Sequence, residues 1–181
     1  MSGAELDAYC QLAIDSGATG ARQVQPASVT TAPWVRWKCQ FGCTGYNRSY
    51  TCPPDSPTPE QTRAMLDSYR RGILVHTQAP HTPDILERRA ASRKMLVDLE
   101  AKMFLDGYYK AFVLLSGSCA LCGGECAKVR GEPCKNGLRV RPSMEACGID
   151  VYRTARNSGF PVNVLQTRTD TRNYFALLLV D

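Results

Sequence analysis

Histidine is scarce in this sequence, because only His76 and His81 among its 181 residues are of this type. His76 falls within an expected strand and His81 directly precedes an expected helix cap, so we expect both to be structural residues with hydrogen-bond partners. The chain also lacks a P-loop, a G-x-G-x-x-G after a strand and a nucleophile elbow. These absences argue against the common nucleotide-binding enzymes and α/β-type serine hydrolases, and they leave cysteine as the main reactive side chain.

Long hydrophobic runs are missing as well. No apolar stretch approaches the roughly 20 residues that cross a bilayer, and the first seven residues lack the basic and apolar regions of a secretory leader. We therefore expect a cytoplasmic protein with no membrane partner, whose thiols stay reduced. The net charge of +5 is modest. It suits an anionic substrate or an acidic partner, and it gives no reason to expect binding of nucleic acid.

Cysteine, by contrast, is abundant, with nine residues of this type. In a reducing compartment, clustered cysteines indicate metal or redox chemistry rather than disulfides. Four of them fall within sixteen residues, are interleaved with glycines and follow the spacing C-x2-C-x3-C-x7-C: Cys119, Cys122, Cys126 and Cys134. Thiols this close together in the sequence predict a compact cage of thiolates around a metal centre.

Two kinds of metal centre fit this group. Structural zinc is typically held by two close pairs of ligands, whereas this group has one C-x2-C pair, Cys119 and Cys122, followed by gaps of three and seven residues. Four such thiols could still hold zinc. An iron–sulfur cluster is larger than a single ion, so staggered gaps of two, three and seven residues suit it, and glycine-rich backbone can donate N–H groups to its sulfurs. Pro133 beside Cys134 stiffens the chain at a ligand position. The spacing favours a [4Fe–4S] cluster, with zinc as the alternative.

A second group has three thiols, in the spacing C-x3-C-x8-C: Cys39, Cys43 and Cys52. Three thiols can hold a cluster with one iron left open, which would offer a Lewis-acid site to a small substrate. Alternatively, a fourth residue closes the site, and the cluster then only transfers electrons or is structural. Cys10 and Cys147 are candidates for this fourth ligand, but neither lies in a motif.

The apolar pattern predicts one metal-binding α/β domain over residues 1–181. A strand over 72–76, a helix over about 83–107 and a strand over 110–116 predict a βαβ unit with a right-handed crossover. The second strand leads directly into the motif that starts at Cys119. We therefore expect the metal centre beyond the carboxyl end of a strand, where parallel sheets place their ligand sites.

The rest of the expected fold is a mixed sheet of about four strands with packed helices and cysteine-rich metal-binding loops. The further elements are helices over 4–16, 59–70 and about 142–159, and a C-terminal β-hairpin of 162–165 and 173–180. On the long helix, the basic residues are expected at the solvent-exposed face, with docking of an acidic partner as the alternative: Arg88, Arg89, Arg93 and Lys94. Trp34 and Trp37 are expected in the core or shielding the cluster rather than forming a binding surface.

Several segments together resemble one known family. They are Lys38-Cys39-x3-Cys43-x2-Tyr46, Ser49-Tyr50-Thr51-Cys52-Pro53-Pro54, Gly117-x-Cys119-x2-Cys122-x3-Cys126, Pro133-Cys134, and Arg141-Pro142-Ser143-Met144-Glu145-Ala146 with Gly148-Ile149-Asp150-Val151. From about residue 5 to the C-terminus, the chain is similar to the predicted metal-binding proteins known as domain of unknown function 2284. The resemblance implies a small cytosolic α/β protein of bacteria or archaea that carries cysteine-bound iron–sulfur centres, and it implies no established reaction.

Carried over residue by residue, the resemblance implies seven ligand candidates, Cys39, Cys43, Cys52, Cys119, Cys122, Cys126 and Cys134. The family pattern does not require a cysteine at position 147. The stretch 141–150 follows the ligands directly, so its expected role is packing and hydrogen bonding around the cluster, with Arg141 facing the negative charge.

Three functions follow from these observations. The first is an electron-transfer or redox accessory protein with one or two [4Fe–4S] clusters and a redox protein partner. The second is an enzyme, an iron–sulfur oxidoreductase component, that binds a small-molecule substrate at an open iron held by Cys39, Cys43 and Cys52. The third is a non-catalytic zinc protein.

Overall fold

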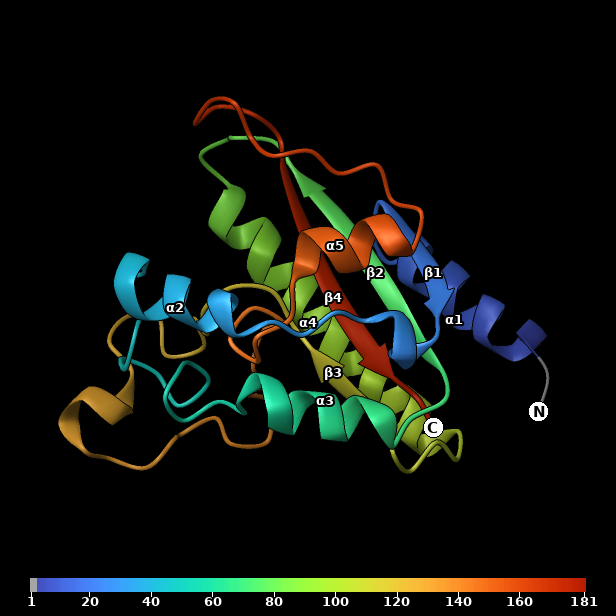
Figure 1. The fold of residues 1–181 in the computed structure, drawn as a ribbon, viewed down its shortest axis with the longest axis horizontal. Coiled ribbons are helices and arrows are strands. Elements are labelled where there is room, and N and C mark those ends of the chain that lie inside the picture. Colours follow the sequence, from blue (N-terminus) through green and yellow to red (C-terminus); the bar gives the residue numbers. More distant parts are fainter. Residues whose placement is uncertain (1–2) are drawn as a thin grey trace.

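The computed structural model describes residues 3–181, which fold around one four-stranded sheet (Figure 1). Its strands lie side by side in the order β1 (Gly20–Val24), β2 (Gly72–Ala79), β4 (Arg172–Leu179) and β3 (Phe112–Leu114). The expected α/β class with about four strands is confirmed. The pairing differs from the expected mixed sheet, because each neighbouring pair is antiparallel.

The expected βαβ unit is present in a split form. Strands β2 and β3 run parallel to each other because both pair antiparallel with β4, which lies between them. Helix α4 (Ile85–Leu105) forms the crossover. The expected C-terminal hairpin is wrong, because 162–165 is not a strand. The physical reason is burial: residues 177–179 are fully buried and favour a central strand, whereas Val164 is 63% exposed.

Helices cover both faces of the sheet. Successive residues of β2 alternate between two hydrophobic cores, so Ile73 and Val75 face one side and Leu74 the other. The first core is completed by Leu6 of α1 (Gly3–Asp15) and Leu99 of α4. The second core contains side chains from α3 (Pro59–Asp67) and α5 (Val151–Asn157), the two helices in front of the sheet in Figure 1.

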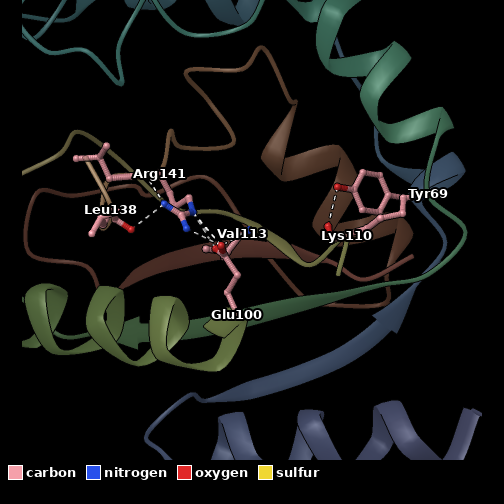
Figure 2. Close-up of polar contacts among 7 residues, drawn as sticks. Tyr69, Glu100, Lys110, Val113, Leu138 and Arg141 are labelled. Carbon is pink, nitrogen blue, oxygen red and sulfur yellow. Dashed lines mark hydrogen bonds and ion pairs between the residues drawn. The ribbon is translucent and has the colours of Figure 1, made fainter. Parts of the chain in front are cut away.

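Local signals account for the start of α3. The Thr58 hydroxyl accepts a hydrogen bond from the Gln61 N–H at 3.2 Å, and the Gln61 side chain accepts one from the Thr58 N–H at 2.8 Å. This is the capping box that the sequence predicts, with Pro59 in the first turn. Beyond the helix, the Tyr69 hydroxyl donates to the Lys110 carbonyl at 2.8 Å, which ties this segment to the start of β3 (Figure 2).

Two segments differ from their expected form. Trp34 and Trp37 lie on α2 (Pro33–Gly42) and are 44% and 65% exposed, so the expectation that they lie in a core is wrong. The helix expected from residue 142 begins only at Val151, because 144–148 form turns between isolated bridges at Ser143 and Ile149. Two short 3₁₀ helices complete the chain, η1 (Pro26–Ser28) and η2 (Ala127–Arg130). Among residues 3–181, no helix is both long and apolar enough to cross a membrane.

Candidate metal centre

Two long loops carry six of the nine cysteines. The first loop, residues 43–58, joins α2 to α3, and the second loop, residues 116–142, follows β3. The second loop returns to the point where it starts, because the Leu115 N–H donates to the Pro142 carbonyl and the Met144 N–H donates to the Leu115 carbonyl, both at 2.8 Å. Figure 1 shows both loops and α2 gathered at one end of the molecule, away from the C-terminus.

A buried ion pair anchors the end of the second loop (Figure 2). The Arg141 guanidinium donates to both carboxylate oxygens of Glu100 on α4, at 2.6 and 2.9 Å, and Glu100 also accepts from the Val113 N–H at 3.0 Å. Arg141 further donates to the carbonyls of Leu138 and Val140. The expectation that Arg141 faces the charge of a cluster is therefore wrong, since a carboxylate from another element binds it.

Arg36 anchors the first loop in a similar way. Its guanidinium donates to the carbonyls of Ser56 at 3.1 Å and Ala146 at 3.0 Å, and the Ser56 hydroxyl donates to the same Ala146 carbonyl at 2.7 Å. Hydrogen bonds from a charged donor are about twice as strong as neutral ones. Arg36 therefore fixes the end of the first loop against the turn at 143–148.

The two loops also contact each other directly. The Tyr50 hydroxyl of the first loop donates to the Glu132 carbonyl of the second at 2.7 Å. The Lys128 ammonium of the second loop donates to the Asn47 side chain at 2.8 Å and forms an ion pair with Asp55. Their cysteines are consequently held in a common region rather than at opposite ends of the protein.

The three thiols of the first group lie near one another. Cys39 is in the last turn of α2, Cys43 directly follows that helix, and Cys52 lies buried within the first loop. Burial raises the pKa of the Cys39 thiol, and the neighbouring Cys43 and Cys52 raise it further, while Arg36 lowers it. The Gly45 N–H donates to the Cys43 sulfur at 3.4 Å.

Cys52 connects the two groups of cysteines. Burial raises the pKa of its thiol, and the nearby Cys43 and Cys119 raise it further, whereas hydrogen bonds from the Ser49 and Thr51 hydroxyls lower it. Cys119 belongs to the second loop, so its effect on the pKa of Cys52 indicates that thiols of both groups lie in the same neighbourhood. Sixty-seven positions separate the two residues, and no local pattern in the sequence signals their proximity.

Cys126 makes the second connection between the groups. A hydrogen bond from the Lys128 N–H lowers the pKa of its thiol, and the Tyr50 N–H, the Ser49 hydroxyl and Cys122 donate to it as well. Ser49 and Tyr50 belong to the first loop. The Asn136 side chain donates to the Cys122 sulfur at 3.7 Å. The Cys126 thiol therefore loses its proton more readily than an ordinary cysteine, and metals bind the deprotonated thiolate.

A family model described as that of a predicted metal-binding protein (DUF2284) matches residues 22–180. The chain belongs to this family. Comparison with the curated proteins and with the solved structures found no match. Membership of DUF2284 supports metal binding in general terms and leaves the metal open. Among residues 3–181, no three His, Cys, Asp or Glu side chains lie in the geometry of a preformed site for a metal ion.

The remaining cysteines of this DUF2284 chain differ in their surroundings. Cys134 is half-buried, and within the described residues it shares no hydrogen bond with another cysteine. Cys10 and Cys147 lie in the two hydrophobic cores, where burial raises the pKa of their thiols to about 11 and about 12. These buried positions do not favour either residue as the fourth ligand of the first group.

Arg93 is a residue of this region whose position the sequence did not indicate. It was expected at the solvent-exposed face of α4, but its guanidinium is half-buried and donates to the carbonyls of Ser116 at 2.7 Å and Ser118 at 3.0 Å. Ser116 and Ser118 lie in the three residues before Cys119. Burial lowers the pKa of Arg93, while the nearby Cys119, Glu145 and Cys52 raise it. Arg93 therefore holds the entry of the second loop and supplies positive charge beside the thiols.

Proposed function

We propose that this DUF2284 protein binds a [4Fe–4S] centre between its two cysteine loops and acts in electron transfer or as a redox accessory protein. The observation that carries the proposal is the direct contact between the two cysteine loops, in which Tyr50 donates to the Glu132 carbonyl at 2.7 Å and Lys128 pairs with Asp55. The influence of Cys43 and Cys119 on the pKa of Cys52 supports it. Thiols from both groups then serve one common metal region. In this proposal the site holds one shared assembly rather than two independent clusters.

The donors around the thiols support a negatively charged centre. Backbone N–H groups of Gly45, Lys128 and Tyr50 and the side-chain amide of Asn136 all point at cysteine sulfur. Such hydrogen bonds stabilise thiolates and tune the potential of a bound cluster. Arg93 adds a positive charge on the side of Cys119. A bound cluster would accept and release single electrons, and the residues of the chain would hold it, shield it and balance its charge.

The surface next to the loops supports the proposed redox protein partner. Helix α2 carries Cys39 in its last turn and presents Trp37 and Phe41, which are 65% and 80% exposed. Large apolar side chains that are exposed next to one another often mark a protein–protein interaction site. We expect the partner to contact α2, so that electrons pass through the loops over a short distance.

Anaerobic purification followed by metal and sulfide analysis tests the proposal. We expect a brown protein with iron and acid-labile sulfide in roughly equal amounts, whose visible absorption bleaches reversibly on reduction. A colourless protein with stoichiometric zinc would overturn the cluster and leave the zinc protein. If a small ligand changes the spectrum of the reduced protein, one iron is open, which would favour the enzyme at Cys39, Cys43 and Cys52 over a purely electron-transferring centre.

A further inference from the structure

A small pocket lies beside the second loop, between α4 and the sheet, and arginine dominates its lining. Its walls include the guanidinium groups of Arg89 and Arg93 and the hydroxyl-bearing side chains of Thr77, Ser92 and Tyr174. The free volume is about 20 Å³, enough for one water-sized atom. A ligand that enters this pocket therefore reaches in with a single atom rather than with a large group.

The positive charge of the pocket is not matched by ion pairs. Arg88, at its rim, is neutralised by Asp84 four residues earlier. Arg89 and Arg93 form no ion pair with any carboxylate among residues 3–181. Glu145 acts on Arg93 electrostatically without forming an ion pair, and it accepts a hydrogen bond from the Gly117 N–H at 3.4 Å.

Arg89 is the more available of the two for a ligand, because no hydrogen bond or ion pair within residues 3–181 uses its guanidinium. Arg93 is partly balanced by the thiols and binds the carbonyls of Ser116 and Ser118. Arg89 instead lies over the Tyr174 ring, with its guanidinium carbon 5.2 Å from the ring centroid, and makes no hydrogen bond within the described chain. Its donors remain available although the side chain is half-buried.

The backbone is shaped to admit this side chain. Gly117 has φ +63°, and a Cβ atom built there would lie 2.6 Å from an Arg89 guanidinium nitrogen. Any other residue at position 117 would displace Arg89 and would also strain the backbone. Contact with the Tyr174 ring and close approach to Gly117 both restrict the guanidinium, which lowers the entropic cost of binding a ligand.

We infer that Arg89 and Arg93 form a binding site for an oxyanion, the negatively charged oxygen of a carboxylate or a phosphate. Guanidinium groups match such oxygens geometrically. The hydroxyls of Thr77 and Ser92 hydrogen-bond to each other at 3.4 Å, which leaves one of the two O–H groups free to donate to a ligand. The site depends only on these side chains, so the inference stands whether or not the loops bind iron.

Calorimetric titration of the anaerobically purified full chain with inorganic phosphate and, separately, with acetate tests the inference at constant ionic strength. We expect saturable binding of at least one anion, and the anion that binds identifies the class of ligand. Arg89→Gln should weaken this binding roughly tenfold, the loss expected for one charged hydrogen bond, and Arg89→Lys should weaken it less. Gly117→Ala should also weaken it, by displacing Arg89.

Arg153→Gln is the matched control, because Arg153 is exposed on α5 at the other face of the sheet and its substitution removes the same charge. This variant should bind the anion as the wild type does. The inference is overturned if neither anion binds, or if Arg89→Gln and Arg153→Gln bind it equally well. Arg89 makes no structural hydrogen bond, so circular dichroism of Arg89→Gln should match that of the wild type.

Discussion

The nine cysteines of this chain occupy two environments. Cys10 and Cys147 are packed among apolar side chains, and burial raises the pKa of both thiols. The other seven cysteines lie on the two loops or, for Cys39, in the last turn of α2, and hydrogen bonds lower the pKa of one of them, Cys126. Hydrogen-bond donors alone do not separate the two sets, because Thr62 donates to Cys147 as well. Neighbouring thiols, as around Cys52, are what mark a cysteine as a ligand candidate.

Cys52 shows that burial by itself does not separate the two environments. It is as buried as Cys10, each with 8% of its surface exposed, and burial raises the pKa of both thiols. The difference is that Cys52 lies beside Cys43 and Cys119 and accepts hydrogen bonds from Ser49 and Thr51. Because its thiol resists ionisation, metal binding must displace its proton, so we expect metal uptake to release protons.

The largest expected effect concerns iron content. Cys52→Ala and Cys126→Ala should each remove nearly all iron from the anaerobically purified protein, because the two loops share one assembly in our proposal. Cys10→Ala is the control and should keep the iron content of the wild type, since Cys10 packs in the core. Iron per folded protein checks this result. A loss of about half the iron in each loop variant would instead indicate two independent clusters.

Local features of this structure were predictable, and features that depend on distant residues were not. Thr58 and Gln61 are three positions apart, so their capping box is visible in the sequence. The place of β4 between β2 and β3 depends on pairing with residues about 65 to 105 positions away. The spacing of Cys119 to Cys134 is likewise local and predicts a metal centre, whereas the approach of Cys52 to Cys119 and the partner of Arg141 arise only on folding.

The second prediction tests how the loop that carries Cys119 to Cys134 is attached to the core. Glu100→Ala removes the partner of Arg141 and leaves the Val113 N–H without its acceptor. Loss of one partner of a buried pair costs about 3 kcal/mol of unfolding free energy. The same substitution at Asp98, which pairs with Lys94 on the exposed face of α4, should cost less than about 0.5 kcal/mol.

Urea-induced unfolding followed by circular dichroism measures both changes. The Glu100→Ala variant should also lose iron more readily to a chelator, because the return of the second loop is no longer fixed at Arg141. Equal unfolding free energies for the Glu100 and Asp98 variants would show that the pair in Figure 2 does not anchor this loop.

The smallest expected effect is a decrease in unfolding free energy at alkaline pH that is caused by the buried Cys147. The pKa of the Cys147 thiol is about 12 in the folded protein, against about 8.5 in an unfolded chain. When the pKa of a group is higher in the folded protein than in the unfolded chain, its contribution to stability is complete at pH values below the unfolded pKa. For Cys147 this contribution is lost between about pH 8.5 and 12.

Raising the pH from about 7.5 to about 9.5 should therefore destabilise the wild type by about 1 kcal/mol more than Cys147→Ala. Unfolding free energies of the two metal-free proteins at both pH values measure this difference, and the shared ionisation of the loop thiols cancels in it. Parallel pH profiles would mean that Cys147 ionises as easily in the folded protein as in the unfolded chain, and the contrast between core and loop cysteines would then not hold at this position.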